Sequence, residues 1–236
     1  MSPAPVALSV VLPAYNEEAL LDGCVRQLHS ALASLGVSAE IIIVNDGSRD
    51  RTKDIADTLA RDLPGVVAVH QANQGIGGAF RTGTARATGE YLILWPADMP
   101  AEPADLAPYT KQFGQADVIV GVRRQRLGYN PLMRFNAWLY PKLIATLFGL
   151  RLRDVNWIHA YRRALFAKIT LTQRGIPMLV EALVRLRDLG ATFAEVDVAM
   201  KVRLGGVASA SRFKIMWRTL TGLFAFWKLW RSERRT

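Results

Sequence analysis

Apolar residues in the first part of the chain follow two patterns. Short continuous apolar runs are typical of strands buried on both faces of a sheet. They alternate with stretches in which apolar residues recur every three or four positions, as in an amphipathic helix. The runs predict strands over 8–12, ended by Pro13, and over 41–44, 66–69 and 91–94, and the periodic stretches predict helices over 18–35, 50–63 and 79–87. This alternation predicts βαβ units and a mainly parallel sheet.

Beyond residue 103 the alternation continues with looser spacing. Helices are predicted over 104–113, 131–150 and 178–189, strands over 117–122 and 193–200, and a final amphipathic helix over 211–230. We find no internal repeat or linker that divides the chain. The expected fold class is therefore α/β, with helices on both faces of one sheet, a continuous domain over 1–210 and a basic C-terminal helix over 211–236.

Composition agrees with a domain that has a sizeable core. Half of the 236 residues are apolar, and the formal net charge is +10, with arginines clustered from Arg123 onward. This charge favours phosphates, phospholipid headgroups or nucleic acid as partners. The aromatic residues near these arginines occur at helical spacing among apolar residues instead of alternating with basic ones, so we do not expect nucleic acid.

The start of the chain and its single cysteine bear on the compartment. Residues 1–5 have neither the basic nor the apolar region of a signal peptide. Cys24 has no partner for an intrachain disulfide, which fits a reducing compartment. No stretch reaches the roughly 18 uninterrupted apolar residues of a spanning helix. These features lead us to expect a cytoplasmic protein.

Polar motifs follow the predicted strands at the sheet edge where ligands of parallel sheets bind. The motifs are Pro13-Ala14-Tyr15-Asn16-Glu17-Glu18 after the first strand, Asn45-Asp46-Gly47-Ser48 after the second, and Asn73-Gln74-Gly75 after the third. As a set they resemble family 2 glycosyltransferases of the GT-A fold, which transfer a sugar from a nucleoside diphosphate. The resemblance implies a Rossmann-like nucleotide-sugar half over about 1–103 and an acceptor half over about 104–210.

Side chains in these motifs suit a nucleotide. Tyr15 and Glu17 can stack on and hydrogen-bond a base or ribose, and the Asp46 carboxylate can accept from a base N–H. The family often has an acidic residue at the position of Asn45, whose amide oxygen can still accept. An alternative is that Asp46 and Ser48 only cap the helix that follows. The implied nucleotide-sugar contacts are Pro13, Tyr15, Glu17, Asn45, Asp46, Gln74, Gly75 and Asp98.

The segment Trp95-Pro96-Ala97-Asp98-Met99 occupies the position of the family's Asp-x-Asp motif in a degenerate form. In the family, the acidic pair and a nearby polar residue hold Mg²⁺ or Mn²⁺ against the diphosphate. Here Pro96 and Pro100 stand at two of those positions. Mg²⁺ often takes only one or two carboxylates, so we expect Asp98 to be the metal ligand with reduced affinity. The alternatives are metal-independent transfer and a non-catalytic domain.

The second half resembles the subfamily of polyprenyl-phosphate sugar synthases, which includes dolichol-phosphate mannose synthase. The resemblance rests on Gly121-Val122-Arg123-Arg124, on Arg134 and on the segment that begins at Asp154. It implies that the two arginines Arg123 and Arg134 grip the acceptor phosphate, as forked guanidinium groups can. A lipid phosphate is already anionic, so Asp154 is expected to orient arginines instead of taking a proton. The alternative is a plain solvated basic face.

The late segment 203–212 resembles the subfamily's Arg-x-x-Gly-x-Ser loop. The resemblance assigns Arg203 and either Ser209 or Ser211 to substrate phosphates, because a glycine turn with guanidinium and hydroxyl groups can fold over a diphosphate. The alternative is a simple surface loop.

The expected function combines these features. We expect an inverting glycosyltransferase, peripheral on the inner face of the membrane, that moves a hexose from a GDP- or UDP-sugar to polyprenyl phosphate. The amphipathic helix 211–230 suits an anionic bilayer, and its alternative partner is the domain itself, a second copy of the chain or a membrane protein. Two other functions remain open: a non-catalytic nucleotide-sugar or lipid-phosphate binding protein, and a transferase that acts on a glycan hydroxyl.

Overall fold

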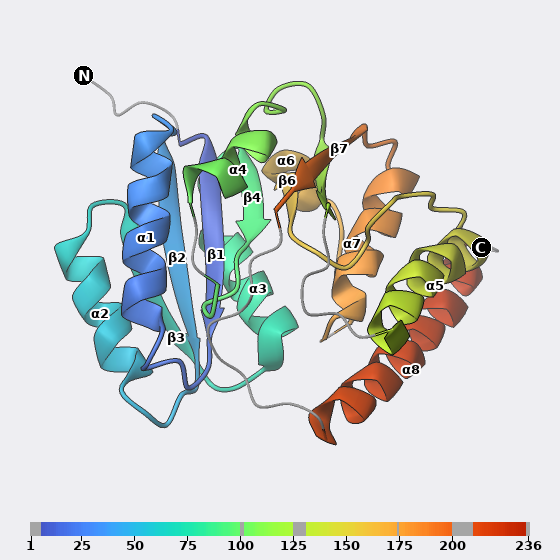
Figure 1. The fold of residues 1–236 in the computed structure, drawn as a ribbon, viewed down its shortest axis with the longest axis horizontal. Helices are drawn as coiled ribbons and strands as arrows, with labels where there is room; N and C mark the ends of the chain where they lie inside the picture. Colours follow the sequence, from blue (N-terminus) through green and yellow to red (C-terminus); the bar gives the residue numbers. More distant parts are fainter. Residues whose placement is uncertain (1–5, 100–101, 125–130, 174, 200–209, 235–236) are drawn as a thin grey trace.

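A seven-stranded sheet forms the centre of the molecule in the computed structural model, which describes residues 6–99, 102–124, 131–173, 175–199 and 210–234 (Figure 1). The strands are β1 (Leu8–Ala14), β2 (Ala39–Asp46), β3 (Val66–Gln71), β4 (Tyr91–Leu94), β5 (Val118–Arg123), β6 (His159–Arg162) and β7 (Phe193–Val198). Their order is β3-β2-β1-β4-β6-β5-β7. Only β6 runs antiparallel to its neighbours among these strands, so β1 to β5 and β7 end at the same edge.

Helices cover both faces of the sheet, as predicted. The helices are α1 (Leu21–Ser34), α2 (Thr52–Asp62), α3 (Gly75–Arg86), α4 (Pro103–Thr110), α5 (Pro131–Phe148), α6 (Arg163–Phe166), α7 (Pro177–Asp188) and α8 (Ala210–Glu233). One apolar cluster joins α1, α2 and α4 to one face of the sheet. A second cluster joins α3, α5, α6, α7 and α8 to the opposite face. In β1, Val10 and Leu12 belong to the first cluster and Val11 to the second. This alternation gives the mainly parallel α/β architecture that the sequence indicated.

The prediction that Pro13 ends the first strand is wrong. Strand β1 continues to Ala14, and Pro13 is paired with Val44 of β2. The carbonyl of Val11 accepts from the backbone nitrogen of Trp95, on the β4 side. The backbone N–H and C=O groups of residues two apart along a strand face the same neighbouring strand. The nitrogen of Pro13 therefore lies beyond the end of β4, where the ladder needs no N–H donor.

Other elements also differ from the sequence prediction, and the short helix α6 was not predicted. Helix α3 begins at Gly75, four residues before the predicted start at Ala79. The segment 154–163 carried no predicted strand, yet β6 forms there and lies between β4 and β5. Because β4 pairs with β6, the sheet is continuous between the first and second halves of the chain.

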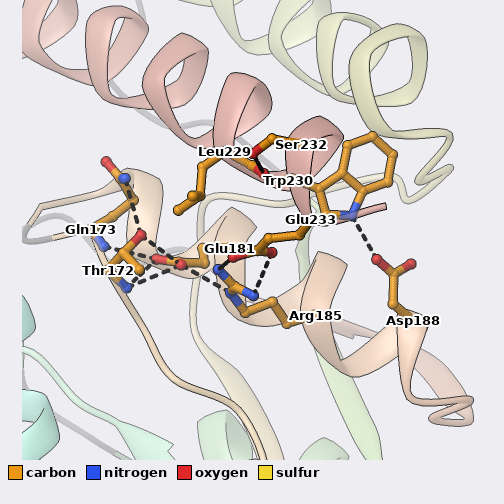
Figure 2. Close-up of polar contacts among 9 residues, drawn as sticks. All are labelled: Thr172, Gln173, Glu181, Arg185, Asp188, Leu229, Trp230, Ser232 and Glu233. Atoms are coloured by element: carbon orange, nitrogen blue, oxygen red, sulfur yellow. Dashed lines mark hydrogen bonds and ion pairs between the residues drawn. The ribbon is translucent and has the colours of Figure 1, made fainter. Parts of the chain in front are cut away.

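Helix α8 is fixed to α7 by the polar network drawn in Figure 2. The carboxylate of Glu181 is fully buried and accepts from Arg185 Nε at 3.0 Å. Arg185 also donates to both carboxylate oxygens of Glu233, at 3.1 and 3.2 Å. Near the end of α8, Trp230 Nε1 donates to Asp188 Oδ2 at 2.6 Å. The ion pairs and this hydrogen bond hold the C-terminal half of α8 against the domain.

Apolar contacts complete the docking of α8. Phe226 stacks on Phe148 with ring centroids 5.2 Å apart, and Trp227 Nε1 donates to the carbonyl of Leu147 at 3.1 Å. These contacts join α8 to the end of α5, and the two helices lie side by side in Figure 1. One face of the amphipathic helix is thus packed on the domain, as one of the sequence-based alternatives held.

Candidate functional site

The loops after β1 and β2 are bonded to each other at the carboxyl edge of the sheet. The backbone nitrogen of Asn16 donates to Ser48 Oγ at 3.1 Å, and Asn16 Oδ1 accepts from the backbone nitrogen of Arg49 at 2.9 Å. Asn16 adopts a φ of 54°, in the left-handed region that asparagine tolerates better than most residues. This turn presents Tyr15, which is 45% exposed, at the surface beside the edge.

The loop after β3 contacts the loop after β2 through Gly47 and Asp46. Gly47 has a φ of +71°, and a Cβ atom there would lie 2.8 Å from the backbone nitrogen of Asn73, so only glycine fits without strain. The buried Asp46 carboxylate accepts from the backbone nitrogens of Gln74 and Gly75, both at 2.8 Å, and from Gln71 Nε2 at 2.6 Å. Asp46 therefore caps α3 and not α2, the helix that comes next after Asp46 along the chain. This cap explains why α3 begins earlier than predicted.

These contacts bear on the assignment of Asp46 to a nucleotide base. A carboxylate has about four acceptor positions, and the protein occupies three of them here. The geometry is compatible with one further donor, such as a base N–H. Its assignment as a base contact stays a prediction, as do those of Pro13, Gln74 and Gly75.

Asn45 is held by a partner that the sequence analysis missed. Asn45 Oδ1 accepts from the backbone nitrogen of Ser48 at 3.1 Å, and its amide nitrogen lies 3.3 Å from His70 Nδ1. His70 Nε2 lies 2.8 Å from Asp57 Oδ1, so the contacts fit an imidazole that accepts at Nδ1 and donates at Nε2. His70 directly follows the predicted strand 66–69, and only the structure extends β3 to include it and places it opposite Asn45.

Asp98 lies in the loop after β4, at the same edge. It is half-buried between the buried residues Ala97 and Met99. Burial, together with the negative charges of Asp98 and Glu17, raises the pKa of the Cys24 thiol to about 12. Asp98 and Glu17 therefore both lie close enough to Cys24 for their charges to act on it, although their loops follow different strands.

The residues around Asp98 set a limit on metal binding. Within the described ranges, no three His, Cys, Asp or Glu side chains are grouped closely enough to hold an ion. Pro96 offers no side-chain ligand. The site fits an ion that a bound diphosphate helps to hold, because Mg²⁺ commonly uses one or two carboxylates with phosphate and water oxygens.

Arg123 and Asp154 form a buried ion pair at the end of β5. Arg123 Nε donates to Asp154 Oδ2 at 2.7 Å and Nη2 donates to Oδ1 at 2.9 Å, in a bidentate arrangement. The two side chains are only 8% and 3% exposed. The Arg123 guanidinium also lies 4.8 Å from the ring centre of Trp157. Asp154 thus fixes the plane of the Arg123 guanidinium.

Electrostatics keep Asp154 ionised and its neighbour His159 neutral. Burial works to raise the pKa of Asp154, but the hydrogen bonds and charge of Arg123 outweigh it and lower that pKa below its ordinary value. Burial lowers the pKa of His159, on β6, to about 4. An anionic Asp154 paired with arginine is a poor proton acceptor, in keeping with the orienting role that we predicted for it.

The remaining predicted residues are not gathered at this edge by the described contacts. Arg134 is exposed on α5, in the second turn from its start. Arg203 and Ser209 lie outside the described residues. Ser211 falls in the first turn of α8, where only the backbone is described.

Comparison with known proteins places the chain in a family. The family model described as Glycosyl transferase family 2 matches residues 9–170. Undecaprenyl-phosphate 4-deoxy-4-formamido-L-arabinose transferases from Pseudomonas paraeruginosa and Pseudomonas aeruginosa are each 30% identical over 223 residues, which is 92% of this chain and 64% of theirs. The chain therefore spans about two thirds of the length of these relatives.

The fold comparison agrees with the GT-A architecture. A crystal structure of glucosyl-3-phosphoglycerate synthase from Mycobacterium tuberculosis, in complex with Mn²⁺, UDP-glucose and phosphoglyceric acid, superposes with a TM-score of 0.71. The match has 19% sequence identity and covers 94% of this chain and 80% of the other. With the seven-stranded sheet and the family match over more than half of its residues, the chain belongs to glycosyl transferase family 2 and has the GT-A fold.

Proposed function

We propose that this chain transfers a hexose from a GDP- or UDP-sugar to a polyprenyl phosphate. The observation that carries the proposal is the shared edge at which Tyr15, Asp46, Asp98 and Arg123 are placed by four different strand ends. The polyprenyl acceptor is supported by the names of the curated relatives, which are transferases to undecaprenyl phosphate. The nucleotide donor is supported by UDP-glucose in the structural neighbour.

The proposed reaction is an in-line displacement at the sugar. An oxygen of the lipid phosphate attacks the anomeric carbon, while the bond between that carbon and the diphosphate oxygen breaks. Attack from the opposite side inverts the configuration. The acceptor phosphate is anionic at neutral pH, so the reaction needs no general base, and the low pKa of Asp154 agrees with this.

Protein groups would orient both phosphates. Asp154 occupies two of the five N–H donors of Arg123 and so sets the direction in which this guanidinium meets an oxyanion. Asp98 is the residue that would hold Mg²⁺ or Mn²⁺ with the diphosphate. When bound, such an ion supplies neutralisation of the charge that develops on the leaving diphosphate.

The proposal places the chain at the cytoplasmic face of a membrane. Its support is an exposed set of large apolar side chains on α5 and α8. These are Phe135, Trp138 and Leu139 on α5, and Trp217, Phe224 and Leu229 on α8. Cations lie over aromatic rings of these helices, among them Lys142 at 3.6 Å from Trp138 and Arg231 at 4.9 Å from Trp227.

Aromatic rings beside cations suit the headgroup region of an anionic bilayer. Such a surface equally fits a second copy of the chain or a membrane protein. Of the helices in the described ranges, none has the length and apolar character to span a bilayer.

The decisive test is turnover. Purified protein is incubated with undecaprenyl phosphate and a panel of GDP- and UDP-hexoses, in Mg²⁺, Mn²⁺ or EDTA, and glycolipid is measured by mass spectrometry. The expected result is a glycolipid from one donor, reduced by EDTA. A parallel incubation replaces the lipid with a glycan acceptor. Nucleotide binding without product on either acceptor would contradict the transferase proposal and favour a binding protein, and product on the glycan alone would contradict the lipid acceptor.

A further inference from the structure

The loop that carries Asp98 is fastened on both sides of that residue. Trp95 is almost fully buried and donates from its backbone nitrogen to the carbonyl of Val11 at 2.9 Å. Its indole Nε1 donates to the carbonyl of Met99, also at 2.9 Å. The backbone nitrogen of Met99 in turn donates to the carbonyl of Pro96 at 3.3 Å. These three bonds close a turn over 96–99 and tie it to Val11 in the middle of β1.

A second side chain reaches the same carbonyl from α1. Cys24 Sγ lies 3.2 Å from the carbonyl oxygen of Met99 and 3.7 Å from that of Pro96. Burial raises the pKa of this thiol to about 12, so the sulfur stays protonated and acts as a weak donor. The Met99 carbonyl therefore accepts from an indole and from a thiol, and moving the turn requires breaking both bonds.

We propose that Trp95, assisted by Cys24, is the positioning residue of Asp98. In the described structure Trp95 bonds only to backbone groups of the loop and of β1, and it acts by fixing the turn from which the carboxylate projects. The inference rests on the proposed function, because it assumes that Asp98 meets a cation bound to the diphosphate of the donor.

The physical reason is preorganisation. A two-carboxylate site gains affinity from a second charge, which this chain lacks because Pro96 stands at that position. A ligand that is already ordered loses little conformational entropy when an ion binds. The entropic cost of binding is therefore small, and one carboxylate contributes more of its charge attraction to the affinity. Pro96 contributes to the same end, because its ring restricts the backbone φ angle of the turn.

The test measures ion binding directly. Mn²⁺ is titrated into protein saturated with UDP or, separately, GDP, and free Mn²⁺ is followed by electron paramagnetic resonance. Trp95→Phe keeps an aromatic ring and removes the N–H donor, and we expect it to weaken Mn²⁺ binding about tenfold, as the loss of one buried hydrogen bond allows. The affinity for UDP or GDP in EDTA should change by less than about twofold.

The control variant lies in β4, the strand that leads into the Asp98 loop. Tyr91 is fully buried in β4, and its hydroxyl donates to the carbonyl of Ala116 at 2.8 Å, away from the Asp98 loop. Tyr91→Phe removes this bond and the two bonds in which the hydroxyl accepts from the backbone nitrogen of Gly114 and from Arg162 Nη2, both at 2.8 Å. It is thus the more severe loss of buried hydrogen bonds, and it should still leave Mn²⁺ affinity unchanged. For the thiol, Cys24→Ser keeps a donor and should behave like the wild type, while Cys24→Ala should weaken Mn²⁺ binding about threefold.

The outcomes separate this inference from the function. If Trp95→Phe binds Mn²⁺ as tightly as Tyr91→Phe does, Trp95 does not position Asp98 and only this inference is overturned. An equal loss of nucleotide affinity in EDTA would indicate general damage and overturn it as well. A wild-type protein that binds neither UDP nor GDP would overturn the proposed function, and the inference with it.

Discussion

The loops after β1, β2 and β3 and the end of β5 hold their site residues by different means. In the first region, short polar side chains bond to backbone groups: Ser48 to Asn16, and Asp46 to Gln74 and Gly75. In the second region, two opposite charges are buried together, Arg123 and Asp154. The first arrangement divides the stabilisation among several bonds worth about 1 kcal/mol each, and the second concentrates it in one pair.

This difference indicates how each region tolerates change. Loss of one loop bond leaves an N–H near the surface that water can reach, whereas loss of one member of a buried pair leaves a charge without compensation. The region of the proposed acceptor phosphate should therefore be far more sensitive to single substitutions and to acid than the region of the proposed nucleotide. Four predictions test this contrast, from the largest expected effect to the smallest.

The largest effect is expected from breaking the ion pair. Asp154→Ala leaves the Arg123 guanidinium buried without its carboxylate and should lower the free energy of unfolding by about 3–5 kcal/mol. Urea unfolding measures it. The double variant Arg123→Met with Asp154→Leu is the control, and it should recover most of the loss because no buried charge remains. A cost below about 1 kcal/mol for Asp154→Ala would contradict the contrast.

Acid should act on the same region through His159. Its pKa falls from 6.5 in the unfolded chain to about 4 in the fold, so the unfolded state binds more protons between these values. Stability is therefore full above about pH 6.5 and is lost as the pH falls toward 4. At pH 5 the loss should be about 2 kcal/mol relative to pH 7.

Unfolding at the two pH values measures this loss, and substitution tests its source. His159→Phe removes the titrating group and should make unfolding less dependent on pH over this range. The control is His29→Asn, in α1 on the other face of the sheet. This variant should keep the pH dependence of unfolding that the wild type shows. An unchanged pH dependence in His159→Phe would rule out His159 as its source.

A smaller effect is expected from the cap of α3. Asp46→Ala removes the carboxylate that accepts hydrogen bonds from the backbone nitrogens of Gln74 and Gly75. The free energy of unfolding should fall by about 1–2 kcal/mol. Asp46→Asn keeps one acceptor oxygen and should cost less. If the carboxylate also meets a base, both variants should weaken UDP or GDP binding in calorimetry, and a tight complex with Asp46→Ala would remove Asp46 from the nucleotide contacts.

The smallest effect is expected from the bond between the first two loops. Ser48→Ala removes the acceptor for the backbone nitrogen of Asn16 at an exposed position. We expect a loss of about 0.5–1 kcal/mol in urea unfolding, because water can replace the hydroxyl. A loss as large as that of Asp154→Ala would show that the two regions do not differ in the way described.

Several parts of the fold and site were accessible from the sequence. The periodicity located the six parallel strands and most helices within a few residues, and the motifs after β1, β2 and β4 do lie at one edge. Strand β6 was missed because its sequence, His-Ala-Tyr-Arg, is not a continuous apolar run, and its pairing partners, β4 and β5, lie far away in sequence. The start of α3 was misplaced because its cap, Asp46, comes from another loop.

The sequence by itself determined the six parallel strands and the polar groups that follow them, because local apolar spacing and turn chemistry are properties of neighbouring residues. Only the tertiary structure decided how those groups are paired. Asp154 lies 31 positions from Arg123 and Asp46 lies 28 positions from Gln74, and no periodicity encodes such contacts. They arise when the strands align at one edge, and that alignment is set by the packing of both faces of the sheet.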